Sequence, residues 1–531
     1  MFQLRKRLVL TTAAPAFTLV ALTLAFVSPV LTNVSAQEHR AVTDTKEEPS
    51  KDIPIPPETT SVTQHQETIG GQAIHYTATA GNLLIGKEDH DELEKPFHSI
   101  FYIAYTEDGA DAKTRPVTFL YNGGPGSATI WLEMGSVGPM RVLSNSPEPT
   151  NNPPFQVVPN EYSLLDKTDL VFIDAPGTGY SHPVGKGTIK DVAGVDEDLQ
   201  AFTRFIIRYI TVNHRWNSPK FLFGESYGTT RSAGLSATLN EAGVQLNGIV
   251  LLSSILNYNA HSAGLDNEYI TDLPSFAAIA WYHNKVPNKP ADVMTFIEQA
   301  RQFARGPYAE ALYAGNALSD ADKNKIADGL GNFTGLSVKF IKDANLRISP
   351  TRFRKELLRD QNIILGRYDA RFEGPDADAA GENPGYDPSD TGISGAYIAS
   401  FHEYLEKDLK FVSQDTYNDS GPGLNQDWDW KHRAVSGSPF GRQQAMPYVA
   451  GDLGDTIRKN PHLKVFAANG IYDLATPFTS TEWELAHMGT ESKMRDNVSW
   501  GYYPAGHMVY LNVEALKSFR QDLGRFYDSA K

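Results

Sequence analysis

The chain is 531 residues long and carries 63 acidic against 48 basic side chains, which give a formal net charge of −15 at pH 7. This acidic surplus argues against nucleic acid or an anionic membrane as a partner. Because the chain has no cysteine, it forms no disulfide, no thiolate metal site and no cysteine nucleophile. Its stability must come from a core, which a chain of this length can build.

The N-terminus has the pattern of a secretion signal. A basic start at Arg5 precedes a run rich in Leu, Val, Ala, Thr and Phe, and small residues close that run. We therefore expect a signal peptide over residues 1–36, cleavage before Gln37, and an exported protein that is periplasmic or secreted. The alternative is a membrane anchor, which prolines inside the apolar run and the polar tail after it disfavour. No membrane contact is expected after cleavage.

The remainder is predicted to be a short leader and one large domain. Residues 37–66 are polar, and we expect a flexible leader because they offer too little apolar surface to offset ordering. Residues 67–531 are predicted to form an α/β domain with a mostly parallel sheet and helices on both faces. Strands are expected at residues 98–105, 116–121, 169–173, 220–223, 248–253, 463–467 and 498–503, and helices at 196–213 and 230–242. Residues 258–442 are helical and loop-rich, which predicts an inserted lid.

The stretch Gly224-Glu225-Ser226-Tyr227-Gly228 follows an apolar strand candidate and has the G-x-S-x-G form of a nucleophile elbow. In that motif a strand turns sharply into a helix and presents the serine hydroxyl beyond the sheet edge. The glycines are needed because a Cβ on either side would crowd the turn. An ordinary Gly/Ser turn has the same letters, so other residues have to support the assignment.

An acid and a histidine follow Ser226 in the order that an α/β-hydrolase requires. Asp473 comes after the strand expected at 463–467, and the glycine-flanked His507 comes after the one at 498–503. A neutral imidazole can take the serine proton, while a carboxylate fixes its tautomer and offsets the imidazolium that forms. A turn-forming aspartate and a surface histidine are the plain alternatives. The ordered placement of all three residues beyond strands favours a triad.

A glycine-rich segment follows the strand expected at 116–121, namely Asn122-Gly123-Gly124-Pro125-Gly126-Ser127. Its backbone N–H groups are unshielded by side chains and can point at an oxyanion together with the N–H of Tyr227. A plain glycine turn and a phosphate loop are the alternatives. The segment lacks the Lys-Ser/Thr that follows the glycines of a phosphate loop, and it lacks G-x-G-x-x-G spacing.

With these blocks the chain resembles the serine carboxypeptidases, α/β-hydrolases that remove C-terminal residues from peptides. The resemblance rests on the glycine block, on the elbow, on Asp473 with Gly506-His507-Met508, and on Asp174-Ala175-Pro176-Gly177-Thr178-Gly179-Tyr180-Ser181. It implies an α/β-hydrolase fold with an inserted lid and peptide substrates with a free C-terminus. We expect no cofactor and no metal, since such a triad needs none and the chain has no H-E-x-x-H pair.

The resemblance also implies roles for single residues. It makes Ser226, Asp473 and His507 the triad, and the N–H groups of Gly124 and Tyr227 the oxyanion hole. It makes Asn122, Gly123 and Glu225 the site of the substrate's terminal carboxylate, with Glu133 as a second glutamate paired with Glu225. In such a pair one carboxyl is expected to keep its proton to high pH and to donate to that carboxylate.

Two other functions use the same features. An acyltransferase or esterase would have the same triad, and a non-catalytic binding protein would keep the fold. A complete triad argues against the binding protein, which has no need for a serine, an acid and a histidine on separate strand ends. Recognition of a free C-terminus at Asn122 and Glu225 would distinguish a peptidase from an acyltransferase. The absence of cysteine departs from the disulfide-containing eukaryotic family members, and the middle of the chain matches them weakly.

Overall fold

The computed structural model describes residues 52–87, 95–421, 424–438 and 441–530. The predicted signal peptide and the first half of the predicted leader, residues 37–51, therefore lie outside the described residues. Among the helices that the described residues form, none has the length and apolar character needed to cross a membrane.

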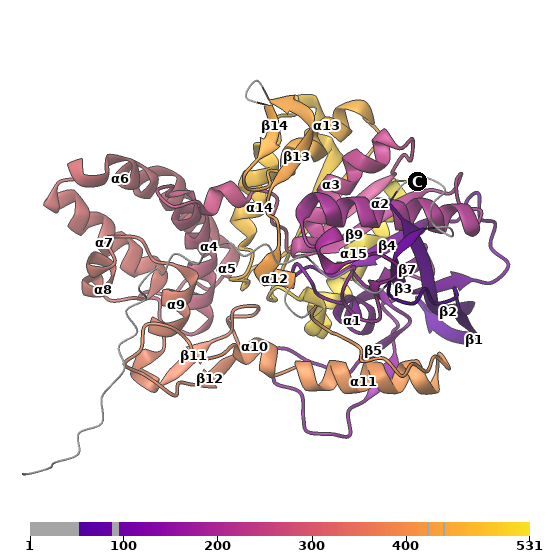
Figure 1. Cartoon of the computed structure of the whole chain (residues 1–531). Helices are drawn as coiled ribbons and strands as arrows, with labels where there is room; N and C mark the ends of the chain where they lie inside the picture. Colours follow the sequence, from indigo (N-terminus) through magenta and orange to yellow (C-terminus); the bar gives the residue numbers. More distant parts are fainter. Residues whose placement is uncertain (1–51, 88–94, 422–423, 439–440, 531) are drawn as a thin grey trace, which may run out of the picture. The chain divides into compact units, whose positions relative to one another are not determined.

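A ten-stranded sheet forms the centre of the fold (Figure 1). Its strands lie in the order β1 (Thr60–Ile69), β2 (Gln72–Gly86), β3 (Pro96–Glu107), β7 (Asp169–Ile173), β4 (Val117–Tyr121), β9 (Lys220–Glu225), β10 (Gly248–Leu252), β15 (Lys464–Gly470) and β16 (Val498–Tyr503), with β8 (His182–Pro183) beside β3. The first four pair antiparallel, and β7 through β16 pair parallel. The prediction of a mostly parallel sheet is confirmed. Parallel pairing brings the carboxyl ends of these strands to one edge.

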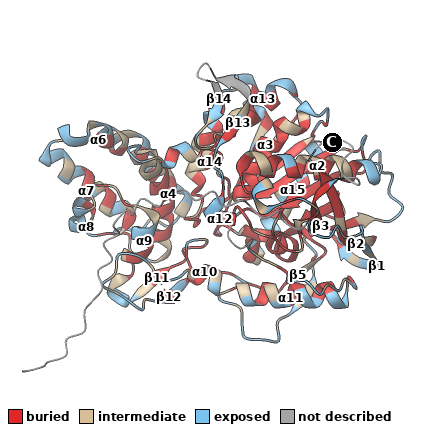
Figure 2. Ribbon diagram, in the orientation of Figure 1, coloured by how far each residue is buried: buried red, intermediate tan, exposed pale blue. Residues whose placement is uncertain are grey.

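Helices cover both faces of the sheet, as predicted. On one face pack α2 (Val195–Val212), α3 (Tyr227–Glu241) and α13 (Ala450–Lys459), and on the other α1 (Ile130–Leu132), α11 (Ser394–Lys407) and α15 (Val513–Ser529). In β10, Ile249 and Leu251 face the first layer, and Val250 and Leu252 face the second. Burial on both faces explains why the parallel strands are continuous apolar runs in the sequence. Figure 2 shows the strands buried between the helices.

The first strand corrects the predicted leader. β1 begins at Thr60 and pairs with β2 along its whole length, so the leader does not extend to residue 66. Ile53 also forms a backbone bridge with Gly185. Most side chains of β1 are exposed or half-buried because the strand lies at the edge of the sheet. A strand that buries so little needs few apolar residues and is easily mistaken for a polar leader.

The segment predicted as an insertion, residues 258–442, falls between β10 and β15. The chain leaves the core at Asn257 and returns at Tyr448, where the two backbones form a bridge. Besides α11, the segment contains α4 (Asn267–Tyr282), α5 (Val293–Phe303), α6 (Ala309–Ala314), α7 (Asp320–Thr334), α8 (Val338–Asp343), α9 (Pro350–Glu356), β11 (Ile363–Leu365), β12 (Glu373–Pro375), α10 (Pro388–Thr391), α12 (Leu424–Asp427), β13 (His432–Ser438) and the start of β14 (Gly441–Gln444). Its first helices enclose a third apolar cluster, to which Ile471, Tyr472, Leu474 and Phe478 beyond the insertion also contribute. α14 (Phe478–Ala486) packs against α4.

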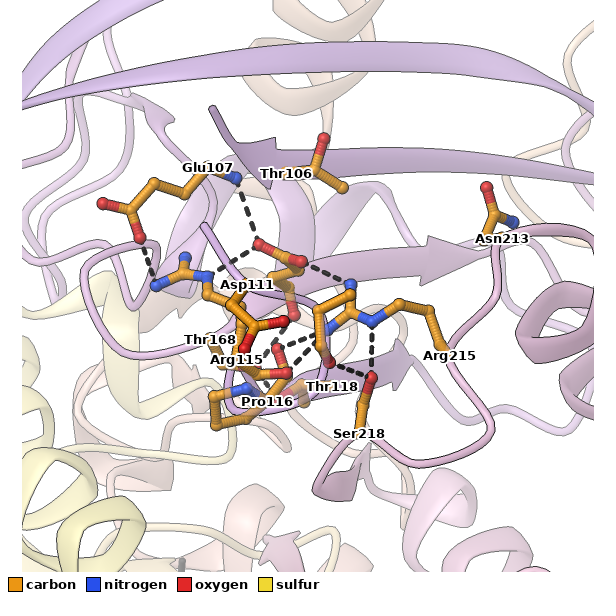
Figure 3. A network of polar contacts seen from close by, with 12 residues as sticks. Thr106, Glu107, Asp111, Arg115, Pro116, Thr118, Thr168, Asn213, Arg215 and Ser218 are labelled. Carbon is orange, nitrogen blue, oxygen red and sulfur yellow. Dashed lines mark hydrogen bonds and ion pairs between the residues drawn. The ribbon is translucent and has the colours of Figure 1, made fainter. Parts of the chain in front are cut away.

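A buried network of ion pairs and hydrogen bonds connects the amino ends of three parallel strands, β7, β4 and β9 (Figure 3). Asp169, the first residue of β7, accepts hydrogen bonds from Arg115 Nε at 2.9 Å and from Arg215 Nη1 at 2.5 Å. Arg215 also donates to the Arg115 carbonyl at 2.7 Å and to Ser218 Oγ at 2.6 Å. Arg115 precedes β4 and Arg215 precedes β9, so the network joins three neighbouring strands. It lies at the edge opposite to the carboxyl ends, where the predicted site residues gather.

Candidate active site

Ser226 makes the turn between β9 and α3. Its backbone has φ 60° and ψ −129°. Few non-glycine residues adopt such a conformation, and it is expected at the apex of a nucleophile elbow. The glycines beside it are sterically required. A Cβ on Gly224 would collide with the backbone of Gly228, and a Cβ on Gly228 would lie 2.8 Å from the Tyr121 carbonyl oxygen.

The structure brings Asp473 and His507 into contact beyond the ends of β15 and β16. Asp473 Oδ2 lies 2.7 Å from His507 Nδ1, and both side chains are buried. Thr476 Oγ1 donates to the same carboxylate oxygen at 2.8 Å. The backbone N–H groups of Ala475 and Thr476 donate to the other oxygen. With the proton of Nδ1 directed at Asp473, Nε2 of His507 is left as the acceptor that a general base needs.

Hydrogen bonds at the end of β10 hold the elbow and the histidine loop together. The Ser226 N–H donates to the Leu252 carbonyl at 3.0 Å, and the next residue, Ser253, donates its hydroxyl to the His507 carbonyl at 2.6 Å. Ser226 and His507 are therefore anchored to consecutive residues of one strand end. Among the described residues the Ser226 hydroxyl makes no hydrogen bond with the imidazole. Catalytic hydrogen bonds are often long without substrate and shorten when it binds.

Neighbouring charges set the basicity of His507. Burial disfavours the imidazolium, but Asp473 and then Glu225 outweigh burial, so the pKa of His507 is raised above its ordinary value. Arg367, which belongs to the insertion, acts in the opposite direction and lowers this pKa. A raised pKa means that the protein stabilises the imidazolium, the form that appears when a serine gives up its proton.

The glycine-rich segment lies directly against the elbow. Gly123 packs so closely on the backbone nitrogen of Tyr227 that a side chain would not fit, and a Cβ there would lie 2.8 Å from Ser226 Cβ. Gly124 has φ 105°, a value that favours glycine, and it is exposed. The segment and the first N–H of α3 therefore border the same space beside Ser226. The arrangement suits an oxyanion hole made by the predicted residues Gly124 and Tyr227.

Arg231 of α3 supports the glycine-rich segment. It is fully buried, and its Nη1 donates to the Asn122 carbonyl at 2.8 Å. Its Nε and Nη2 donate to Asp198 of α2 at 2.7 and 3.1 Å. The guanidinium carbon also lies 4.2 Å from the ring centroid of Phe202. The backbone just before the glycines is thus anchored to a buried ion pair that α2 and α3 share.

Glu225, the last residue of β9, is buried with an unpartnered oxygen. Its Oε2 has no hydrogen-bond partner among the described residues, and neither has the nearby Tyr510 hydroxyl. Burial raises the pKa of Glu225 to about 7, although His507 and then Tyr510 lower it. Tyr510 is near enough to stabilise the carboxylate but makes no hydrogen bond of good geometry with it. Asn122 lies beside Glu225, and its Oδ1 accepts the Leu132 N–H at 3.0 Å. Buried groups without partners are those that a bound ligand would satisfy.

Glu133 is not paired with Glu225, which corrects the prediction. It lies in a π-helical turn (Glu133–Val137), and its Oε1 accepts the Tyr105 hydroxyl at 2.6 Å. Burial raises the pKa of Glu133 to about 8, Tyr105 lowers it, and Asp174 raises it. Burial also raises the pKa of Asp174 to about 6. Tyr105 belongs to β3, and β7 and β4 separate β3 from β9. The turn after α1 thus directs Glu133 away from the elbow.

Several residues of the site have no motif in the sequence analysis. Thr476 shares the Asp473 carboxylate, and Tyr510 lies beside Glu225. Both come shortly after a predicted triad residue, and this spacing is the signal that could have identified them. The residues that the structure describes include no group of three or more His, Cys, Asp or Glu side chains able to hold a metal ion.

Comparison with known proteins points to one family. A model of the serine carboxypeptidase family matches residues 90–509. The pheromone-processing carboxypeptidase KEX1 of Saccharomyces cerevisiae is 31% identical over 134 residues, which make up 25% of this chain and 17% of that protein. The human retinoid-inducible serine carboxypeptidase is 26% identical over 164 residues, 30% of this chain and 33% of that protein. The matched regions thus span a third or less of these relatives.

Among solved structures, the prohormone-processing carboxypeptidase Kex1(delta)p of S. cerevisiae resembles this chain over most of its length. The superposition covers 85% of this chain and 91% of that one, with a TM-score of 0.54 and 15% sequence identity. At this identity the likeness speaks for the fold alone. It confirms the predicted α/β-hydrolase fold.

Proposed function

The chain belongs to the serine carboxypeptidase family, and we propose that it hydrolyses the C-terminal peptide bond of peptides through an acyl-enzyme on Ser226. The observation that carries this proposal is the 2.7 Å contact between the buried side chains of Asp473 and His507. It occurs next to a serine whose positive φ presents it between a strand and a helix. A fold kept only for binding would have no use for this constellation.

The proposed reaction follows from the positions of these groups. Ser226 Oγ attacks the carbonyl carbon of the last peptide bond while His507 Nε2 takes its proton, and Asp473 stabilises the imidazolium. The N–H groups of Gly124 and Tyr227 donate to the oxyanion that forms. His507 then gives the proton to the leaving amine, which departs as a free amino acid and leaves an ester on Ser226. Water, activated by His507, hydrolyses this ester and restores the serine.

Recognition of the free C-terminus is assigned to Asn122, Gly123 and Glu225. The raised pKa of Glu225, about 7, keeps its carboxyl protonated below neutrality. A protonated carboxyl donates a hydrogen bond to the terminal carboxylate, and the Asn122 amide and the Gly123 N–H are two further donors. Above that pKa the ionised Glu225 repels the same group. Glu133 takes no part in this step, because its hydrogen bond is to Tyr105.

The test compares a blocked dipeptide acid with its C-terminal amide, and product release is followed by mass spectrometry. We expect the free acid to be hydrolysed and the amide to be a much poorer substrate. Ser226→Ala should remove nearly all hydrolysis while the melting temperature stays close to that of the wild type, and a fluorophosphonate should label Ser226 only. Equal hydrolysis of both peptides, or of simple esters alone, would support an esterase or acyltransferase instead. Full activity of Ser226→Ala would refute the triad.

We also propose that the protein is exported. The support is the basic start and apolar run of residues 1–36 with small residues before Gln37. Expression of the full chain in a bacterium, followed by cell fractionation and N-terminal sequencing, tests this. A mature protein that begins at Gln37 in the periplasm or medium is expected. An intact N-terminus in the cytoplasmic fraction would refute export.

A further inference from the structure

A loop of the insertion forms part of the wall of the candidate active site. It connects β11 with β12 and is fixed to the loops that carry both Asp473 and His507. The Leu474 N–H donates to the Arg367 carbonyl at 3.1 Å, and the His507 N–H donates to the Tyr368 carbonyl at 2.6 Å. Contact is so close that a Cβ on Gly506 would lie 2.6 Å from Asp369 Cα. Arg367 and Tyr368 thus have a fixed place beside the histidine.

Arg367, Tyr368 and His507 are arranged in series. The Tyr368 ring centroid lies 5.3 Å from that of His507, and the Arg367 guanidinium carbon lies 5.3 Å from the Tyr368 centroid. Arg367 is exposed. Cation–π contact with the tyrosine holds the guanidinium near the histidine while its N–H groups face solvent. The charge is close enough to lower the pKa of His507, against Asp473 and Glu225, which raise it.

The guanidinium of Arg367 contacts the Tyr368 ring but, within the part of the chain that the structure describes, has no hydrogen-bonding partner, unlike two other arginines near it. Among the described residues its side chain makes no hydrogen bond and no ion pair. By contrast, Arg371 binds Asp369 through two hydrogen bonds of 2.9 and 2.6 Å, and Arg354 donates to the Leu365 carbonyl at 2.9 Å. The neighbouring acid, Asp387, accepts the backbone N–H of Arg367 and hydrogen bonds from Ser389. Arg367 therefore offers a free fork of donors at the site.

Arg367 and Glu225 face different neighbours. Arg367 lies within electrostatic range of Tyr258, whose pKa is raised by burial and lowered in part by Arg367. Tyr258 packs on Trp430, with ring centroids 4.8 Å apart. Glu225 lies instead beside Tyr510 and Asn122. A peptide whose terminal carboxylate is at Glu225 has its scissile bond at Ser226, and the residue beyond that bond is the penultimate one.

We propose that Arg367, held by Tyr368, is a specificity-determining residue that binds an acidic side chain of the penultimate residue of the substrate. This rests on the proposed carboxypeptidase function. A guanidinium binds a carboxylate through two parallel N–H···O bonds. A substrate with glutamine or lysine in place of the acidic residue has no carboxylate to accept this pair of bonds. Because Arg367 is exposed, the gain is modest and sensitive to salt, roughly two- to five-fold at low ionic strength.

The test uses blocked dipeptides that share one C-terminal residue and carry Glu, Gln or Lys at the penultimate position. The wild type should show kcat/KM for Glu about two- to five-fold above that for Gln, mostly through KM. The ratio should fall to about one in Arg367→Gln, and Arg367→Glu should prefer Lys. Arg305→Gln is the matched control, because Arg305 is exposed in the same insertion and its guanidinium makes a 3.5 Å ion pair with Glu298 and no other polar contact among the described residues. It should keep the wild-type ratio.

Three outcomes would overturn the assignment. The wild type could hydrolyse all three peptides with no dependence on charge. Arg305→Gln could lower the Glu/Gln ratio of kcat/KM as much as Arg367→Gln does. The preference would then come from the overall charge of the insertion and not from a binding site at Arg367. The preference for Glu could appear only in a second series of peptides, with Glu or Gln at the C-terminal position. Arg367 would then contact the C-terminal residue, which leaves as the free amino acid, and not the penultimate one. Failure to hydrolyse any of these peptides would refute the carboxypeptidase proposal itself.

Discussion

Removing the carboxylate of Asp198 should destabilise the whole domain, because it would leave Arg231 as a buried cation without a counter-charge. The Arg231 and Asp198 side chains are 0% and 2% exposed and share two hydrogen bonds. Breaking a buried pair by removing one partner typically costs roughly 3–5 kcal/mol. A domain has a free energy of unfolding of only about 5–15 kcal/mol. Asp198→Ala is therefore expected to lower stability by a large fraction of the total.

Removing both charges together should cost far less. Aromatic rings surround the guanidinium, with the centroids of Phe202, Tyr121 and Tyr227 at 4.2, 5.2 and 5.4 Å. Methionine at 231 and leucine at 198 would fill this space with apolar groups of similar volume. Such replacements of buried pairs are often neutral or stabilising. The Asp198→Leu/Arg231→Met variant should thus be more stable than Asp198→Ala by roughly 2–4 kcal/mol.

Urea unfolding followed by tryptophan fluorescence measures these differences, and kcat/KM gives a second readout. The double variant still lacks the donor to the Asn122 carbonyl, so the glycine-rich segment is less well positioned. We expect kcat/KM to fall roughly 10- to 100-fold although stability is regained. A double variant no more stable than Asp198→Ala would refute the desolvation argument. A stable double variant with unchanged kcat/KM would refute the anchoring role of Arg231.

Three further predictions follow from buried groups at or near the site. The raised pKa of Glu133, about 8 against an ordinary 4.5, means that its stabilising contribution is complete below pH 4.5 and is lost as pH rises through 8. The unfolding free energy should therefore fall between pH 5 and 8.5 by on the order of a few kcal/mol less in Glu133→Gln than in the wild type. Urea unfolding at several pH values measures this fall, and an equal fall in both proteins would contradict the prediction. The pKa of Glu225, about 7, predicts that KM for peptide acids rises above neutrality with little change in kcat, and Glu225→Gln should remove this rise. Thr476→Val should lower kcat by roughly 10-fold because it removes a donor to the Asp473 carboxylate, and a wild-type kcat would show that the backbone donors suffice.

The parallel strands and the order of the candidate triad could be predicted because each rests on a local pattern. β7, for example, is a continuous apolar run, as burial on both faces requires. Ser226, Asp473 and His507 each follow such a run. In a parallel sheet all strand ends of one kind meet at one edge, so their proximity follows from topology. The helix α3 begins at Tyr227, earlier than the predicted residue 230, because the elbow leads into it without a loop.

The edge of the sheet and the partner of Glu133 could not be predicted in the same way. β1 buries only its last side chain, so its sequence has the polarity of a leader. The role of Glu133 is predicted from the resemblance of its neighbouring residues to the family, and neighbouring residues do not fix the direction of a side chain. The π-helical turn that it begins changes the direction in which the side chain leaves the backbone. Its hydrogen bond with Tyr105 depends on the strand order of the folded sheet.

Residues that the insertion brings to the site carry no pattern at all. Arg367 and Tyr368 lie in a loop far from His507 in the sequence, and the folded structure reveals the contact, for example through the hydrogen bond between the His507 N–H and the Tyr368 carbonyl. This bond uses the backbone, so it constrains where the loop lies but not which side chains the loop carries. The loop backbone holds the His507 loop in place, whereas the charge at position 367 acts on the pKa of His507 and on what can bind beside it. Substrate preference can therefore change at Arg367 while the geometry of Asp473 and His507 stays the same, which is why the sequence motifs predict a reaction class and leave the preferred substrate open.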